Sequence, residues 1–485
     1  MSRRWSWGLA GGLAGAVFVW AAASLASAAS RSDSAAQIRA VLAEQSLAQA
    51  QTAVVVIRLP AGGRSTPAVV FRHNGDVPLL PASNLKVITS AAALETLGRD
   101  FRFRTQLLLR DSDLYLLGDG DPTLGDPTLT RRVGWTYDTV FRQWAAELLR
   151  RGVREVRNIH VDDSIFDGQR VHPNWPENQL HFAYSAEVGG LNFHFNTVEV
   201  LARARQGGTV ELSLTPPTRY VELRNEVRVG DKPGLAGARA GGSNRVVVRG
   251  ELRPGTEDSF AITISDPALY AAEVFREVLA REGVRVTGGL SRVEQTRSAL
   301  TATPGAFTPV GVLETPLPVV LARCNKDSAN LYAESLAKRL AAHATGRPGS
   351  WDGYRLTAGA FLRRLGIPEG QAVLDDGCGL SRGNRLSADA LTAVLVREFT
   401  SANRDVFLES LAVGGVDGTL RSRFTDDLRG RVYGKSGFIN QVFTLSGYLR
   451  ARDGDWYAFA ILFNGASGVR PLHERIVRAI DAGGW

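Results

Sequence analysis

Three short motifs in this sequence place serine, lysine and asparagine side chains at spacings that suit nucleophilic catalysis. The motifs are Ser83-x-x-Lys86, Ser328-x-Asn330 and Lys435-Ser436-Gly437. A serine hydroxyl is a poor nucleophile until a base removes its proton. Lys86 follows Ser83 by one helical turn and therefore lies on the same face of a helix. The spacing predicts that Ser83 is a nucleophile and that Lys86 is its base.

The second motif is expected to serve proton transfer and substrate binding. Ser328 can relay a proton between the lysine region and a leaving amine. Asn330 can hold a substrate amide, because its side chain both donates and accepts hydrogen bonds. The backbone N–H of Ser83 is expected to help hold the developing oxyanion, because N–H groups at the start of a helix have no intrahelical partner.

The third motif is expected to bind the carboxyl-terminal side of a substrate. Lys435 lies in a predicted strand and would offer a fixed positive charge to a free carboxylate. Ser436 can add a hydroxyl donor, and Gly437 would let the substrate backbone approach closely. The N–H of Phe438 is the second expected oxyanion donor.

A rival pair of motifs also occurs, with Ser335 and Lys338 as SxxK and residues 401–403 as SxN. Ser335 falls inside the predicted helix 328–343, where its N–H is used by the helix. Glu334 and Lys338 are expected to form a surface ion pair at spacing i,i+4. The first set of motifs is therefore preferred, because Ser83 stands at the start of a helix.

Lysine is scarce in this chain. Of the 57 lysine and arginine residues, 5 are lysine, namely Lys86, Lys232, Lys326, Lys338 and Lys435. Arginine cannot release its proton at accessible pH, whereas a buried lysine can. A lysine in a chain that otherwise uses arginine is therefore a candidate for proton transfer, and two of the five lie in the motifs.

Hydrophobic patterns predict the elements that position these motifs. Residues 85–97 form a nearly all-apolar helix that must be buried. A strand is predicted at 53–59, and three further strands, 431–439, 442–450 and 456–463, follow one another near the end of the chain with short turns between them. We expect one α/β (α+β) domain from residues 29–98 and 305–485, with an antiparallel sheet flanked by helices. Residues 99–304 are expected to form a β-rich insertion of two nested domains, in which the glycine-rich segment 233–243 is an exposed loop.

The first 28 residues are typical of an export signal. Arg3 and Arg4 precede an apolar stretch over residues 7–25, and small residues follow at 26–28. An uncleaved anchor is the alternative, and either interpretation places the folded part outside the cytoplasm. The net charge of +8 favours anionic envelope surfaces over nucleic acid. Cys324 and Cys378 could form a disulfide or remain two buried thiols, and no cysteine–histidine cluster indicates a metal.

Six stretches of the chain resemble the D-Ala-D-Ala carboxypeptidase/endopeptidase family, the low-molecular-mass penicillin-binding proteins with a large insert after the SxxK motif. They are 81–89 (PASNLKVIT), 118–124 (GDGDPTL), 326–334 (KDSANLYAE), 376–382 (DGCGLSR), 415–420 (GVDGTL) and 434–437 (GKSG). Cys378 and Ser436 are departures, since the family commonly has serine and threonine there.

The resemblance implies a transpeptidase/β-lactamase-like domain that cleaves peptidoglycan stem peptides ending in D-Ala-D-Ala, and often also the D-Ala–diaminopimelate cross-link. It implies covalent inhibition by β-lactams at Ser83 and no cofactor. The charge pattern, which has no basic stripe interleaved with aromatic residues, predicts no nucleic-acid partner and at most peripheral membrane contact. Two alternatives remain. Residues 187–192 (EVGGLN) are similar to the ExxLN motif of a serine β-lactamase, although one residue too long. The second alternative is a non-catalytic wall-binding or scaffold protein.

Overall fold

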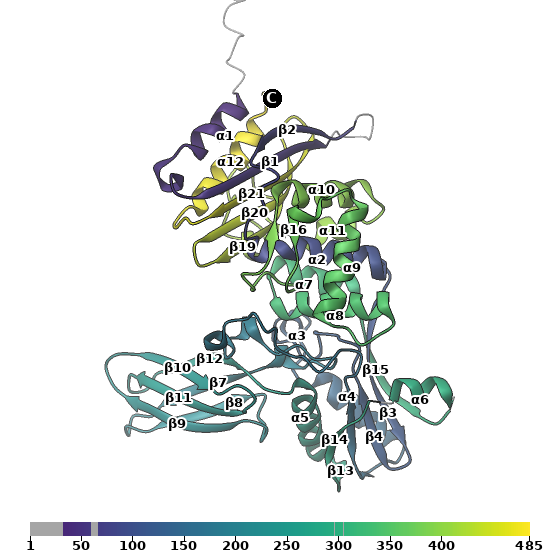
Figure 1. The fold of residues 1–485 in the computed structure, drawn as a ribbon. Coiled ribbons are helices and arrows are strands. Elements are labelled where there is room, and N and C mark those ends of the chain that lie inside the picture. The colour runs from purple at the N-terminus through teal and green to yellow at the C-terminus, as the bar shows by residue number, and fades with distance from the viewer. Residues whose placement is uncertain (1–32, 60–65, 295, 304) are drawn as a thin grey trace, which may run out of the picture.

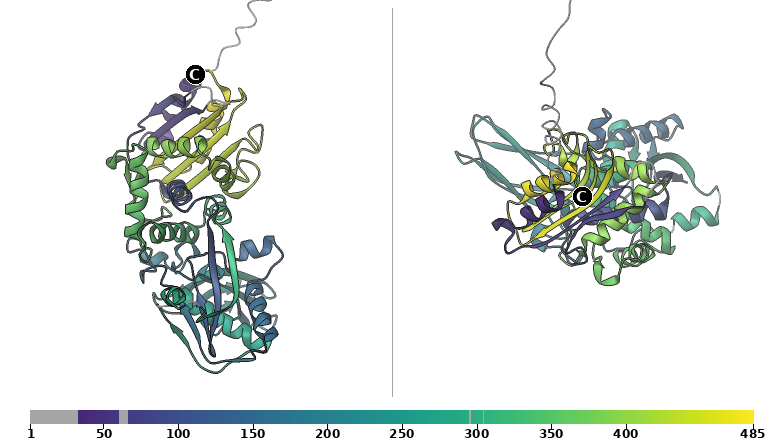
Figure 2. Two further views of the ribbon diagram at one scale, coloured as in Figure 1. Left: turned by 90° about the vertical axis from the view of Figure 1, so that its right-hand side faces the viewer. Right: turned by 90° about the horizontal axis from the view of Figure 1, so that it is seen from above.

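The computed structural model describes residues 33–485, except residues 60–65, 295 and 304. The predicted export signal, residues 1–28, lies outside the described residues. A six-stranded sheet stands at one end of the molecule, a group of helices in the middle, and the insertion at the other end (Figures 1 and 2). Among the described residues, no helix is both long and apolar enough to cross a bilayer.

The six-stranded sheet joins the two ends of the chain, as expected. Its strand order is β18-β19-β20-β21-β1-β2, and all neighbours are antiparallel. The strands are β1 (Gln51–Leu59), β2 (Ala68–His73), β18 (Ala412–Val413), β19 (Val432–Ile439), β20 (Val442–Arg450) and β21 (Trp456–Asn464). The strand β1 therefore lies between its hairpin partner β2 and β21, which follows about 400 residues later in the chain.

Both faces of this sheet are covered, which explains the continuous apolar runs of its central strands. In β1, Val54 and Val56 face α1 (Ser34–Leu42) and α12 (Arg470–Ala482), while Ala53 and Val55 face the helical middle layer. Side chains of a strand alternate between its faces, so one strand contributes to two separate cores.

The middle layer consists mainly of helices from the second half of the chain, packed around one helix from the first. They are α2 (Leu85–Leu97), α7 (Leu317–Lys326), α8 (Asn330–Thr345), α9 (Trp351–Arg364), α10 (Ala388–Thr400) and α11 (Arg404–Ser410), with a small hairpin of β16 (Ala372–Val373) and β17 (Arg385–Leu386). The first ten residues of α2 are all buried, as the apolar sequence predicts. Consequently the residues that follow Ser83 in the sequence lie in the hydrophobic core.

The insertion is built on a five-stranded sheet with the order β14-β6-β4-β3-β15. Its elements are β3 (Arg102–Arg110), β4 (Asp113–Leu117), α3 (Pro127–Arg132), α4 (Thr139–Arg150), β5 (Glu155–Val156), β6 (Ile159–Asp162), α5 (Pro267–Glu282), β13 (Arg285–Val286), β14 (Leu290–Arg292), α6 (Thr296–Ala302) and β15 (Thr308–Pro316). The strand β15 pairs antiparallel with β3 along nearly its whole length. The boundary expected at residue 304 is therefore too early, because this sheet extends to Pro316.

Two three-stranded sheets are nested between β6 and α5. Their strands are β7 (Thr197–Ala204), β8 (Val210–Thr215), β9 (Glu222–Val229), β10 (Gly234–Arg239), β11 (Arg245–Leu252) and β12 (Glu257–Thr263). The expectation of a loop over 233–243 is wrong, because β10 pairs with β11 there. Glycine suits this strand, since a Cβ at Gly237 would overlap the ring of Phe260.

Candidate active site

The turn that carries Ser83 is anchored to the six-stranded sheet. Ser83 lies in the 3-10 turn Ala82–Asn84, directly before α2. The Asn84 amide donates to Thr444 Oγ1 on β20 at 2.6 Å, and that hydroxyl donates to the Pro81 carbonyl at 2.8 Å. The position of the expected nucleophile is thus set by side chains of a strand more than 350 residues away.

Lys86 is fully buried and points at Ser83. Its Nζ donates to Ser83 Oγ at 3.0 Å, to Asn330 Oδ1 at 2.7 Å and to the Cys378 carbonyl at 2.8 Å. These three contacts surround Nζ and fix its position beside the serine. The geometry fits the predicted pairing of nucleophile and base, since the proton has a direct path between the two atoms.

Asn330 begins α8 and connects Lys86 to the insertion. Its Oδ1 accepts from Lys86, and its Nδ2 donates to the Tyr184 carbonyl at 2.8 Å. We expected Asn330 to hold a substrate amide with both its donor and its acceptor. Since Oδ1 accepts from Lys86 and one N–H is used by Tyr184, one N–H and one lone pair of Oδ1 remain for a substrate.

Lys435 on β19 differs from the expected fixed and accessible charge. It is fully buried, and its Nζ donates to Ser328 Oγ at 2.8 Å and to the Ser436 carbonyl at 2.6 Å. Burial and, secondly, the positive charge of Lys86 hold the pKa of Lys435 well below its ordinary value. A lysine in this situation can exchange a proton with Ser328, which agrees with the relay expected of that serine.

The three residues after Lys435 line the edge of the site. Ser436 Oγ donates to Thr419 Oγ1 at 2.8 Å, and the Phe438 ring is exposed. We expected Gly437 to admit a substrate backbone. Packing inside the protein already requires glycine at this position, because a Cβ there would overlap Thr444 Oγ1 and lie 3.0 Å from the Pro81 carbonyl oxygen. Glycine at this position lets β19 pack against the turn that holds Ser83.

Two cavities meet at Ser83, Ser328 and Phe438. One, of about 350 Å³, extends along Ser436 and Gly437, and the other, of about 520 Å³, extends past Asn330 towards the insertion. Both volumes are typical of small-molecule sites. Among the described residues that line the two cavities, none is an aspartate or a glutamate.

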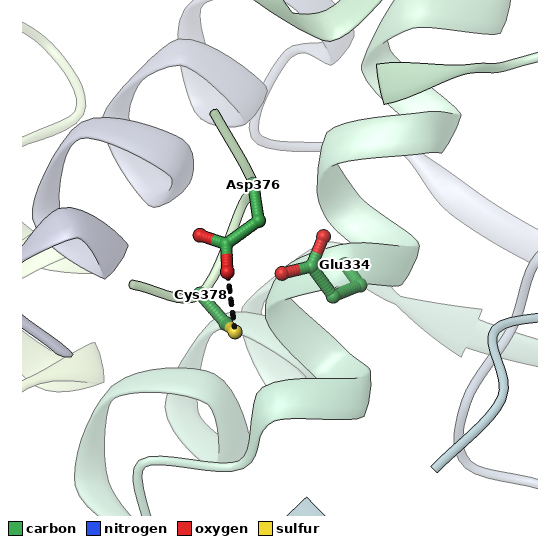
Figure 3. Close-up of side chains that lie close together, drawn as sticks. All are labelled: Glu334, Asp376 and Cys378. Carbon is green, nitrogen blue, oxygen red and sulfur yellow. Dashed lines mark hydrogen bonds between the residues drawn. The ribbon is translucent and has the colours of Figure 1, made fainter. Parts of the chain in front are cut away.

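Beneath Lys86, two carboxylates hold the loop that supplies its third acceptor. Figure 3 shows Glu334 of α8 next to Asp376 and Cys378 of this loop. Asp376 accepts hydrogen bonds from the N–H groups of Gly379 and Ser381 at 2.7 Å, and Cys378 Sγ lies 3.6 Å from its Oδ2. The carboxylates therefore fix the backbone around the Cys378 carbonyl, and this carbonyl fixes Lys86.

Glu334 completes this arrangement from the side of α8. Both of its oxygens accept from the Gly377 N–H at 3.0 Å, and Oε2 also accepts from Trp351 Nε1 at 2.6 Å. Burial and, secondly, the nearby Asp376 raise the pKa of Glu334 to about 7. The expected surface pair of Glu334 and Lys338 is wrong, since both side chains are buried and Lys338 Nζ pairs with Asp167 at 2.6 Å.

The pH dependence of stability should report the proton on Glu334. Its pKa is about 7 when folded and 4.5 as the ordinary value, so the native state binds more protons between these values and its stability falls as pH rises through them. Glu334→Gln keeps the neutral form at every pH. We expect its urea-unfolding free energy to fall less between pH 4.5 and 7 than that of the wild type. Parallel curves for the two proteins would contradict the assignment.

A glycine in the same loop lies against the nucleophile turn. Gly379 has φ +86°, and a Cβ there would overlap the carbonyl oxygen of Ala82. We expect Gly379→Ala to lower the free energy of unfolding by about 2 kcal/mol or more and to slow acylation of Ser83 at least about tenfold. Stopped-flow acylation and urea unfolding measure both effects. Gly370→Ala is the matched control, because a Cβ there meets no atom within 4 Å, and equal behaviour of the two variants would contradict the prediction.

The remaining candidates of the sequence lie elsewhere. Ser335 is buried inside α8, and Ser401 follows the end of α10 and donates to the Glu398 carbonyl. Lys326 pairs with Asp417 at 2.5 Å. The fifth lysine, Lys232, lies in an exposed part of the nested sheets. None of these residues lines the two cavities.

Residues 187–192, which are similar to a β-lactamase motif, and the two cysteines also lie outside the two cavities. Glu187 lies in the insertion and accepts from the Asp266 N–H, and Asn192 bonds to the backbone of Gly189. Both cysteines are free, buried thiols. Cys324 and Cys378 therefore do not form a disulfide with each other.

Sequence reasoning missed four contributors to the site, Tyr184, Glu334, Asp376 and Thr419. Tyr184 acts through its backbone carbonyl, which no residue type signals. Glu334 and Asp376 lie in the stretches 326–334 and 376–382, which resemble the family. The resemblance pointed to these positions but did not predict what the two carboxylates do. Thr419 lies in such a stretch too and bonds Ser436.

The chain is similar to known proteins over most of its length. The model of the D-Ala-D-Ala carboxypeptidase 3 (S13) family matches residues 34–481. The chain is 32% identical to a D-alanyl-D-alanine carboxypeptidase of Actinomadura sp. (strain R39), over 90% of this chain and 81% of that protein. It is 28% identical to the D-alanyl-D-alanine carboxypeptidase DacB of Haemophilus influenzae, over 82% of this chain and 83% of that protein.

The fold is also that of a solved structure. The crystal structure of penicillin binding protein 4 (dacB) from Haemophilus influenzae superposes with a TM-score of 0.74 at 23% identity, covering 92% of this chain and 98% of the other. A β-lactam complex of that protein superposes with a TM-score of 0.69. With the family model spanning nearly all described residues, the chain belongs to the D-Ala-D-Ala carboxypeptidase 3 (S13) family and is a serine-type D-Ala-D-Ala carboxypeptidase.

Proposed function

We propose that the protein removes the terminal D-alanine from peptidoglycan stem peptides through an acyl-enzyme on Ser83, and that it also cleaves D,D-cross-links. The observation that carries the proposal is the buried Lys86 side chain, whose Nζ lies 3.0 Å from Ser83 Oγ at the point where two cavities meet. A peptide has a part on each side of its scissile bond. The two cavities provide one binding region for each part.

In the acylation step, a neutral Lys86 accepts the Ser83 proton while Oγ attacks the carbonyl of the penultimate D-alanine. The oxyanion is held by the backbone N–H groups of Ser83 and Phe438. Ser328 then donates a proton to the departing amine and is resupplied by Lys435, to which it is hydrogen-bonded. Water enters for deacylation, and the same groups act in reverse.

The lining of the cavities favours a peptidase over a β-lactamase. A serine β-lactamase needs a base that activates water against the acyl-enzyme, and Glu187 was the candidate. Glu187 is bonded to the insertion backbone, and no described carboxylate lines either cavity. We therefore expect a β-lactam to acylate Ser83 and the resulting acyl-enzyme to be hydrolysed slowly.

Intact mass spectrometry before and after incubation with a β-lactam tests this proposal, together with an assay for D-alanine released from a D-Ala-D-Ala peptide. One adduct per chain, mapped to Ser83, together with D-alanine release, supports the proposal. Rapid hydrolysis of the drug without a lasting adduct would favour a β-lactamase. Absence of both adduct and D-alanine release would favour a non-catalytic wall-binding protein.

The proposed substrate implies a place of action outside the cytoplasm. The sequence of residues 1–28 supports export by a signal peptide, since a basic start, an apolar stretch and small residues occur in order. The net charge of +8 supports at most peripheral contact with anionic envelope surfaces. Mass spectrometry of the mature amino terminus, after expression in a bacterium, tests cleavage after residue 28.

A further inference from the structure

The turn that carries Ser328 joins the end of α7 to the start of α8 in a strained backbone conformation. Asp327 caps α7, Ser328 follows with φ +58°, and α8 begins at Asn330. A left-handed residue is common directly after a helix, but glycine is the residue that adopts this conformation without strain. Here the position holds the serine that the proposed reaction uses as a proton donor. The surrounding groups therefore have to hold the turn in place.

The insertion holds the residue that precedes Ser328. Arg132 is the last residue of α3, and its Nη2 donates to Asp327 Oδ2 at 3.1 Å. Arg323, one turn before Asp327 on α7, contacts the same oxygen through Nη1 at 3.1 Å. One cation from the insertion and one from the middle layer thus meet at a single carboxylate. Both restrict the backbone directly before Ser328.

The insertion also holds the residue that follows the turn. The Tyr184 carbonyl accepts from Asn330 Nδ2 at 2.8 Å, while Asn330 Oδ1 accepts from Lys86 Nζ. The two contacts fix the orientation of the Asn330 amide, because a reversed amide would point its donors at Lys86 and its oxygen at a carbonyl. The insertion therefore contacts the Ser328 turn on both of its sides.

A buried carboxylate joins the insertion to both helices that flank this turn. Asp126 is fully buried at the start of α3, where its Oδ1 accepts from the N–H groups of Thr128 and Leu129 at 2.8 Å. Its Oδ2 accepts from the Tyr332 hydroxyl of α8 at 2.9 Å and lies 3.4 Å from Arg323 Nη2 of α7. A buried carboxylate is costly to separate from its donors. The helix α3 is therefore fixed to α7 and α8 at this point.

We propose that Arg132 is a positioning residue for the reaction, through which the insertion holds the Ser328 hydroxyl where it protonates the leaving amine. Arg132 acts through Asp327 and lines neither of the cavities that meet at Ser83. The inference rests on the proposed peptidase function and deepens it, because it gives the insertion a part in proton transfer. The Arg132 side chain is 51% exposed, and such an ion pair adds little to overall stability. Its loss should therefore change the rate of this step more than it changes unfolding.

The test compares two substrates that differ in the group that leaves. One is a diacetyl-Lys-D-Ala-D-Ala peptide, and the other is a thioester in which thioglycolate replaces the terminal D-alanine. A departing amine needs a proton, whereas a thiolate leaves without one. A displaced Ser328 should therefore slow cleavage of the peptide more than cleavage of the thioester. A smaller folded fraction lowers kcat/KM equally for both substrates and leaves the peptide-to-thioester ratio unchanged.

We expect Asp327→Ala to lower the peptide-to-thioester ratio of kcat/KM about tenfold or more, because both arginines lose their acceptor. Arg132→Gln should lower the ratio about fivefold, since Arg323 still contacts Asp327. Arg132→Lys keeps the positive charge and should return the ratio to that of the wild type. Cleavage of the thioester should stay within about twofold in all three variants, and the thermal midpoint of Arg132→Gln should equal that of the wild type.

Arg131→Gln is the matched control, because Arg131 lies on the same helix, is exposed, and has no ion pair among the described residues. Ser328→Ala removes the proton donor itself and sets the scale of the effect. A ratio that falls in Ser328→Ala but not in Asp327→Ala or Arg132→Gln overturns the inference and leaves the peptidase function intact. An unchanged ratio in Ser328→Ala overturns the donor role of Ser328 and this inference together. A wild type that cleaves neither substrate overturns the proposed function as well.

Discussion

Ser83→Ala should lose both β-lactam labelling and D-alanine release, with turnover reduced by about 10⁴-fold or more. The hydroxyl is the atom to which Lys86 donates at 3.0 Å, and no acyl-enzyme can form without it. Intact mass spectrometry measures the labelling, and an assay for free D-alanine measures turnover. The alanine fits the 3-10 turn, so the thermal midpoint should change little.

The rival motif supplies the matched control for this experiment. Ser335 is also the serine of an SxxK sequence, but it is buried inside α8 and its Oγ has no hydrogen-bond partner among the described residues. Ser335→Ala should therefore retain labelling and turnover. Labelling that survives in Ser83→Ala and disappears in Ser335→Ala would reverse the assignment.

Lys86→Arg should be as damaging as Lys86→Ala, with kcat/KM reduced by about 10²–10⁴-fold in each. Arginine keeps the positive charge but cannot take a proton from Ser83. The guanidinium is also larger than the fully buried ammonium, which already contacts three acceptors at 2.7–3.0 Å. Steady-state hydrolysis of a D-Ala-D-Ala peptide measures the loss.

Lys326→Arg is the control for this substitution. Lys326 forms an ion pair with Asp417, and an arginine can maintain such a pair. Its activity should remain near that of the wild type. A Lys86→Arg variant that acylates at a normal rate would show that Lys86 supplies charge and not a base.

The three motifs could be predicted because each is a short run of residues that are close together in the sequence. The nearly all-apolar run after Ser83 predicted the buried helix α2, and apolar runs predicted the strands of the six-stranded sheet. The boundary near 304 was misplaced because β15 belongs to its sheet only through pairing with β3, a contact between segments about 200 residues apart.

The environment of the site was less predictable. That Lys435 is buried, that Gly437 faces Thr444, and that Glu334 carries a raised pKa all depend on which segments pack together. Backbone acceptors such as the carbonyls of Tyr184 and Cys378 carry no signal in residue type. The motifs therefore predict which groups react, whereas the protonation of these groups depends on the fold.

The anchoring of the Ser83 turn by β20 has a consequence for how the enzyme is made. Residues 33–100 leave the ribosome first, but Asn84 finds Thr444, and β1 finds β21, only when the last part of the chain has been synthesised. The expected oxyanion donor Phe438 also comes from this part. A chain that ends before β19–β21 therefore contains Ser83 but cannot assemble the site around it. We expect peptidase activity to appear only after these strands have been synthesised.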